Sequence, residues 1–181
     1  AAFYGIGAYV TAILTATYQV PPLLSLPAAV LIAMIVAWIV GIPTLRLSGY
    51  YLGMGTLGFG MIVHIIIREW SSVTGGASGF VGIPPLTAGP LTFDSEKHYF
   101  FLVWVIVLLS FIMCRRIIDS RVGRALRAIH DGEKAAAAVG VDTKKLKLQV
   151  FILSAGMAAL AGFLYAHLIY FISPGTFGFI T

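Results

Sequence analysis

Apolar residues along the 181-residue chain form five long runs, separated by breaks that contain proline, glycine or charged residues. The runs cover residues 1–17, 23–40, 50–67, 99–114 and 148–171. A helix needs about 20 residues to cross the ~30 Å hydrocarbon core of a bilayer. The fifth run meets that length, and we expect Arg115 and Arg116 to extend the short fourth run by reaching the interface. The glycine-rich third run is compatible with either a spanning helix or a broken, re-entrant one. The pattern predicts an all-α fold, a polytopic integral membrane helical bundle with about five spans.

The composition supports a membrane protein and excludes several other classes. The chain is 59% hydrophobic and only 10% charged, whereas soluble domains average about 45–50% apolar and about 25% charged residues. One cysteine, Cys114, excludes an internal disulfide. No metal-ligand or hydrolase motif is present, so we expect no catalytic residue and no metal site. Both ends are apolar, and we therefore expect a fragment: a single transmembrane domain over residues 1–181, truncated at both ends.

The basic residues are concentrated in one internal segment, residues 115–147. This segment holds nine of the twelve lysines and arginines and carries the whole net charge of +5. Short loops rich in Lys and Arg stay on the cytoplasmic side of a membrane. We therefore predict that 115–147 is cytoplasmic. Alternation of the spans then places residues 41–49 inside and residues 18–22, 70–98 and 173–181 outside.

The basic segment itself predicts two short helices. Asp119 or Ser120 can cap the first, in which Val122, Ala125, Leu126 and Ile129 form one apolar stripe. Asp131 can cap a second helix over residues 132–139, with Glu133 in its first turn and Gly140 at its end. A segment of about 33 residues is longer than a simple connection between two helices needs to be. Three roles remain open: lying on anionic lipid, padding the bundle, or docking a cytoplasmic partner through the alanines at 135–138.

Small residues mark two further faces. In the fifth run they recur every four positions and predict a face that packs closely against another helix. These residues are Ser154, Ala158, Gly162 and Ala166. In the third run, a group around Thr56 is compatible with packing alone or with a substrate pathway at a helix break. This group comprises Gly53, Gly55, Thr56, Gly58 and Gly60. His64 and His167 lie near the outer ends of these two runs, as hydrogen-bonded interface residues or as gating residues.

Several motifs occur in the order found in one family of transporters. They include the sequence from Gly123 to Ile129, the Ala135-Ala136-x-x-Val139-Gly140 pattern and the run from Leu160 to Ala166. The glycine-rich Thr74–Pro84 segment and Ile172-Ser173-Pro174 fit the same order. Together they resemble the M-type permeases of branched-chain amino-acid ABC importers over nearly the whole chain. One departure is that Lys134 stands where the broader permease signature has a glutamate, with Glu133 one position earlier.

The resemblance implies a transport subunit that catalyses no reaction and binds no cofactor itself. In that family two related permease subunits form the channel, two cytoplasmic ATPases bind ATP, and a periplasmic binding protein delivers leucine, isoleucine or valine across the bacterial inner membrane. It also implies that the basic segment couples to an ATPase. The coupling residues would be Arg124, Arg127, Asp131, Glu133, Ala135, Ala136, Val139 and Gly140. The chain has no GxxxxGK[ST] phosphate loop of its own and no feature for nucleic acid. Alternatives are a permease for urea or another small polar solute, or a polytopic assembly subunit that transports nothing.

Overall fold

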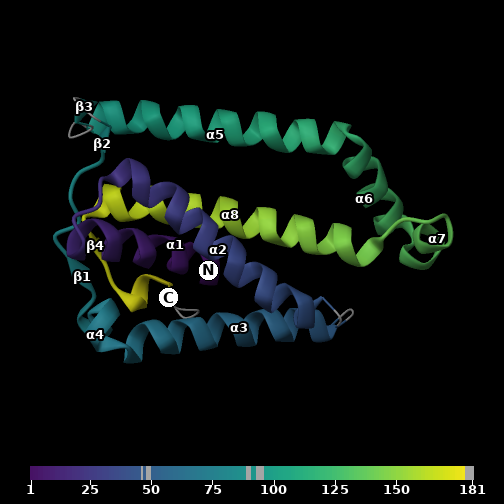
Figure 1. Cartoon of the computed structure of the whole chain (residues 1–181), viewed down its shortest axis with the longest axis horizontal. Helices are drawn as coiled ribbons and strands as arrows, with labels where there is room; N and C mark the ends of the chain where they lie inside the picture. The colour runs from purple at the N-terminus through teal and green to yellow at the C-terminus, as the bar shows by residue number, and fades with distance from the viewer. Residues whose placement is uncertain (46, 48–49, 89–90, 93–95, 178–181) are drawn as a thin grey trace.

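The computed structural model describes residues 1–45, 47, 50–88, 91–92 and 96–177. Five apolar helices form a bundle (Figure 1). They are α1 (Ala2–Ala12) with its π-helical continuation η1 (Ile13–Thr17), α2 (Pro22–Thr44), α3 (Tyr50–Glu69), α5 (Glu96–Asp119) and α8 (Thr143–Ile169). The helices α1, α2 and α8 make the centre of the bundle, with α3 along one edge and α5 along the other.

Short elements join the long helices at the two ends. At one end lie α6 (Arg121–Asp131) and α7 (Glu133–Ala138). The opposite end holds α4 (Ser71–Thr74), η2 (Gly76–Ser78), the strands β1 (Phe80–Val81), β2 (Thr87–Ala88), β3 (Leu91–Thr92) and β4 (Phe171–Ile172), and η3 (Pro174–Phe177). The pairs β1–β4 and β2–β3 are antiparallel, with Phe80 opposite Ile172 in the first.

Four of the helices are long and apolar enough to cross a membrane, namely α2, α3, α5 and α8. The apolar helix over Ala2–Thr17 is shorter. The prediction of a polytopic all-α membrane bundle is therefore confirmed, with two small strand pairs at one end. The third run is one continuous helix rather than a broken one, and the fourth extends through Arg115 and Arg116 to Asp119.

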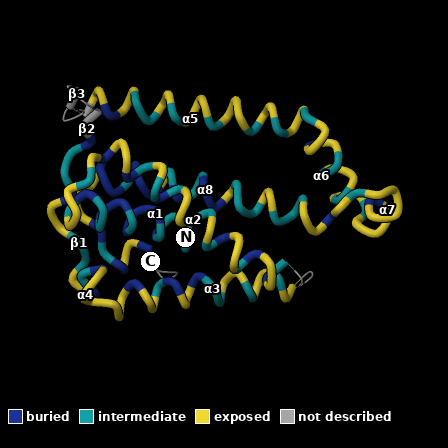
Figure 2. Tube along the Cα trace, viewed as in Figure 1, coloured by how far each residue is buried: buried dark blue, intermediate teal, exposed yellow. Residues whose placement is uncertain are grey.

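Many large apolar residues of α2, α3 and α5 are exposed, and Figure 2 shows exposed residues recurring along these helices. In water this arrangement would be unfavourable, but in a bilayer lipid chains solvate such faces. Along α5, Tyr99 is the buried residue among those described, with 5% of its surface exposed.

The closest helix contact joins α1 to α8 through small residues. A Cβ atom on Gly162 would overlap the backbone carbonyl of Tyr4, and one on Gly7 would overlap the backbone of Ala159. Ala8 and Ala166 are fully buried nearby. Such contacts bring backbones together and increase van der Waals packing, which drives helix association in membranes.

The segment after α8 folds back toward the bundle. After β4, Phe177 is buried against the rings of Tyr4, Tyr9 and Tyr165. In Figure 1 this yellow segment lies between α1 and α3. The described part of this segment therefore packs on the bundle, and the placement of residues 173–181 on the outer side stays a prediction; residues 178–181 lie outside the described residues.

Candidate functional site

A tight joint connects α5 to the basic segment. Ser120 caps α6, its Oγ accepting hydrogen bonds from the N–H groups of Val122 (3.1 Å) and Gly123 (3.4 Å), as one of the two predicted caps requires. A Cβ atom on Gly123 would overlap the carbonyl of Ile118, so only glycine allows α6 to turn this closely against α5. The Arg127 guanidinium donates to the Ile118 carbonyl at 2.9 Å. It satisfies an acceptor at the helix C-terminus, where positive charge is favourable.

The second helix of the segment is shorter than predicted. It begins at Glu133 after the N-cap residue Gly132, which forms no side-chain cap, and it ends at Ala138. Asp131 is the last residue of α6, so its predicted capping role is wrong. The α6 helix continues through Asp131, and the Gly132 N–H donates to the Ala128 carbonyl. Gly140 adopts a left-handed φ of 87°, as expected for a residue that ends a helix.

An ion pair fixes α7 to the start of α8. Lys147 Nζ lies 2.6 Å from Glu133 Oε2, and the hydrogen bond from Lys147 lowers the pKa of Glu133 below its ordinary value. Asp142 caps α8 by accepting from the Lys145 N–H at 3.0 Å. The basic segment therefore forms a folded unit joined to both α5 and α8.

The coupling residues predicted from the sequence divide into two groups. Exposed positions form the outer surface of the loop, and Val139 is 80% exposed there. The exposed residues are Arg124, Arg127, Asp131, Glu133, Ala135, Val139 and Gly140. Ala136 is only 3% exposed and therefore supports the loop from inside. Sequence reasoning missed the Glu133–Lys147 pair because the two residues lie on different helices, α7 and α8, and meet only when the chain turns between them.

The predicted small-residue face of α8 is placed in part against α1. Gly162 and Ala166 are buried there, Ala158 is half-buried and Ser154 is exposed. The buried positions Ala155 and Ala159 continue the contact face. The face therefore turns around α8 instead of following a strict four-residue repeat, because an α-helix has 3.6 residues per turn.

The glycines predicted as a pathway lie along α3. Gly53 and Gly58 have open space where a Cβ would be, and Thr56 is exposed, its hydroxyl donating to the Gly53 carbonyl at 2.8 Å. A Cβ on Gly55 would lie 3.1 Å from the Leu47 side chain, and Gly60 is buried. Gly60 is therefore buried, whereas the other four positions are exposed or half-buried.

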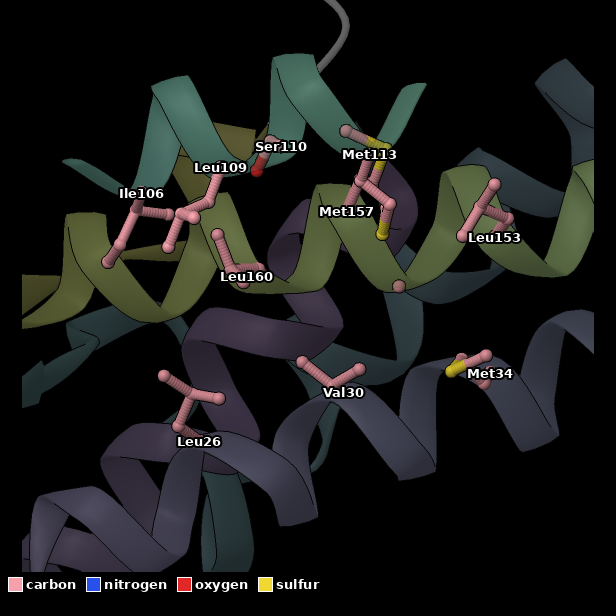
Figure 3. A pocket seen from close by; sticks show the side chains of 11 residues that line it. Leu26, Val30, Met34, Ile106, Leu109, Ser110, Met113, Leu153, Met157 and Leu160 are labelled. Atoms are coloured by element: carbon pink, nitrogen blue, oxygen red, sulfur yellow. The ribbon is translucent and has the colours of Figure 1, made fainter. Parts of the chain in front are cut away.

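Two cavities lie between the helices of the bundle and its connecting segments. The first, of about 380 Å³, lies between α2, α5 and α8. Figure 3 shows apolar side chains and three methionines pointing into it from all three helices, with Ser110 as the polar group. Flexible methionine side chains fill irregular spaces of this kind. The second cavity, of about 280 Å³, is polar and lies at the opposite end from the basic segment, between α3 and the segment after β4.

The two histidines have different surroundings. His167 is 1% exposed, and its Nδ1–H donates to the Pro84 carbonyl at 2.9 Å, since a carbonyl can only accept. This bond holds the end of α8 to the loop before α5, as an interface role predicts. His64 lies at the polar cavity, and its buried Nδ1 has no hydrogen-bond partner among the described residues. No cluster of three or more potential metal ligands occurs within the part of the chain that the structure describes.

A family model described as "Branched-chain amino acid transport system / permease component" matches residues 1–181. The chain belongs to this permease family. Over 98% of its length it is 34% identical to the high-affinity branched-chain amino acid transport permease LivM of Escherichia coli K12. It spans 47% of that relative, or about half of its length.

Other members of the family are more distant. LivH of Salmonella typhimurium, also named as a high-affinity branched-chain amino acid permease, is 28% identical over 62% of the chain and 39% of the relative. The autoinducer 2 import permease LsrC of Escherichia coli O9:H4 is 28% identical over 91% of the chain and 46% of the relative. No solved structure matches the chain significantly.

Proposed function

We propose that this chain is part of the permease subunit of an ATP-driven importer that moves branched-chain amino acids across the bacterial inner membrane, with residues 115–147 in the cytoplasm. Two ATPases, a second related permease and a periplasmic binding protein complete the assembly. The observation that carries the proposal is the folded α6–α7 unit, which is joined to the ends of two long apolar helices in a permease-family chain.

The geometry of this unit suits force transmission. The joint at Gly123 and Arg127 connects it to α5, and the Glu133–Lys147 pair connects it to α8. A displacement of α7 by a closing ATPase pair would therefore reach both helices without unfolding the loop. Such a device is a two-state element, and ATP is the ligand that favours one state.

Docking of an ATPase on the exposed face of α7 is tested by Val139→Asp. A carboxylate at this exposed position, buried in the interface, would weaken the complex. The matched control is Val81→Asp, because Val81 is a similarly exposed valine at the opposite end of the bundle. We expect a pull-down of the full-length subunit with its partner permease to retain the ATPases in wild type and in Val81→Asp, and to lose them in Val139→Asp. If all three samples retain the ATPases equally, the assignment of the docking surface to α7 is wrong.

The α3 glycines are proposed as part of the substrate pathway. Gly58→Leu adds a large side chain where the structure leaves open space, so the fold tolerates it. We expect normal assembly and a strong loss of leucine uptake in proteoliposomes. Unchanged uptake would remove Gly58 from the pathway.

A second substrate class is favoured by the similarity to LsrC, whose name specifies autoinducer 2 import. Uptake assays with leucine, autoinducer 2, urea and other small polar solutes distinguish the classes. A correctly assembled complex that transports none of them would support the alternative of an assembly subunit.

A further inference from the structure

We propose that the polar cavity between α3 and the segment after β4 binds the α-carboxylate of the transported amino acid. His64 and Arg68 of α3 and Ser173, Pro174 and Gly175 line this cavity. The proposal rests on the proposed function, because it assigns a subsite for that substrate.

The chemistry of the lining residues favours an anion. Arg68 contributes a guanidinium, Ser173 a hydroxyl and His64 an imidazole, and no carboxylate of the described residues lines the cavity. A guanidinium presents two parallel N–H groups that match a carboxylate. Among the side chains that the structure describes, Arg68 forms no ion pair. The half-buried His64 has a buried Nδ1 without a partner within the same residues. A small anion would satisfy both groups.

The cavity is held in shape by the glycine-rich loop. The Thr74 hydroxyl contacts the carbonyls of Ile67 and Trp70 at 2.6 and 2.8 Å, which fixes the end of α3 beside Arg68. A Cβ on Gly79, whose φ is 76°, would overlap the Ile172 carbonyl and would lie 3.0 Å from Ser173 Cα. Glycine at this position therefore lets the segment carrying Ser173 approach the loop.

The opposite wall is fixed by aromatic contacts. Phe177 packs on Tyr4 and Tyr9 of α1 with ring-centroid distances of 5.4 and 5.7 Å. The segment between β4 and Phe177 is thus fixed at both ends, and Ser173 Oγ lies 3.2 Å from Thr176 Oγ1. A site whose walls are already ordered loses less entropy when a ligand binds.

The position of the cavity suits entry of a substrate. It lies at the end opposite the basic segment, which is the periplasmic side in the proposed orientation. Its volume of about 280 Å³ is near the lower end of ligand pockets and suits a small molecule. A carboxylate bound here would orient the amino acid as it leaves the binding protein.

The test uses the complete importer in proteoliposomes with its binding protein. We expect Arg68→Gln to reduce leucine uptake about tenfold to a hundredfold, the range for losing a hydrogen bond to a charged group, while Arg68→Lys restores part of it. Gly175→Ala adds a methyl group in ordinary contact with Ser173 and narrows the cavity without strain, so it should also reduce uptake. The control Lys97→Gln removes an outer positive charge that does not line the cavity and should transport normally.

A second readout identifies the ligand. Without the binding protein, leucine should raise the Tm of the wild-type complex, whereas leucinol, which lacks the carboxylate, should not, and Arg68→Gln should abolish the shift. Equal uptake by wild type and Arg68→Gln would overturn the subsite while leaving the importer function intact. A wild-type complex that assembles but imports no branched-chain amino acid would instead overturn the proposed function. A loss in Arg68→Gln that occurs only in vesicles with anionic lipid would assign the cavity to a phospholipid headgroup and overturn the proposal.

Discussion

Two of the helices around α8, namely α1 and α5, contact it in different ways. The backbone of α1 touches that of α8 at Gly7 and Gly162. In contrast, α5 contacts α8 through side chains: the Tyr99 hydroxyl donates to the Leu164 carbonyl, and Cys114 Sγ lies 3.7 Å from Met157 Sδ. Apolar side chains of the first half of α5 pack on the cluster that contains Phe163 and Leu164. Between these contacts lies the apolar cavity of about 380 Å³.

This difference separates a rigid part of the molecule from a movable one. The α1–α8 pair excludes lipid and solvent by close backbone contact, and any separation would lose many van der Waals interactions. The middle of α5 can shift without breaking such a contact, and α5 leads directly into the α6–α7 unit. We infer that α1 and α8 form the frame against which the middle of α5 moves.

The largest expected effect follows from breaking the frame with Gly162→Leu. The new side chain would overlap the Tyr4 backbone, which cannot rotate away as a side chain can. Overpacking that forces backbones apart costs about 1–3 kcal/mol or more, and we expect loss of the folded subunit. Size-exclusion profiles in detergent should show aggregation, whereas Gly53→Leu, with open space at its Cβ, should remain monodisperse. Normal folding of Gly162→Leu would mean that α1 and α8 are not in backbone contact.

A smaller effect is expected when α5 loses its polar anchor through Tyr99→Phe. The substitution leaves the buried ring in place and removes the hydrogen bond to Leu164, which is worth about 1 kcal/mol. We expect a Tm lower by a few degrees and faster hydrogen exchange near the start of α5. The control Tyr51→Phe removes an exposed hydroxyl and should leave both measurements unchanged. If Tyr99→Phe also has no effect, the anchor does not hold α5.

The sequence predicts the long helices better than the contacts that modify their packing. Long apolar runs define α2, α3, α5 and α8 because each must satisfy its backbone hydrogen bonds within the bilayer. The small residues at Gly162 and Ala166 likewise indicate where another helix approaches. The fold-back of Phe177 was not predicted, since the apolar segment after β4 carries no periodicity that distinguishes a chain leaving the bundle from one returning to it.

The candidate site likewise combines features that the local sequence predicts with contacts that it does not. The caps at Ser120 and Asp142 and the turn at Gly140 depend on neighbouring residues, and of these Ser120 and Gly140 were predicted from sequence. Arg68 and Ser173 line one cavity although about a hundred positions separate them along the chain. Their association depends on the β1–β4 pairing, and two-residue strands give almost no pattern in a sequence.

The smallest effect concerns the attachment of α7 to the frame, which Glu133→Gln weakens. The pair with Lys147 is exposed, and exposed pairs add little to global stability. We therefore expect unchanged folding but faster hydrogen exchange of the α7 amides at pH 7. Because the Glu133 pKa is lowered in the folded protein, its contribution is present above the ordinary value of 4.5 and is lost as the pH falls through the lower folded value. The difference between wild type and Glu133→Gln should accordingly shrink as the pH falls below 4.5. The control is Asp131→Asn, which removes a carboxylate at the end of α6 that forms no ion pair among the described residues. It should match wild type at pH 7 and also below pH 4.5. A difference that persists in acid would show that α7 is held to α8 by its packing and not by this charge pair.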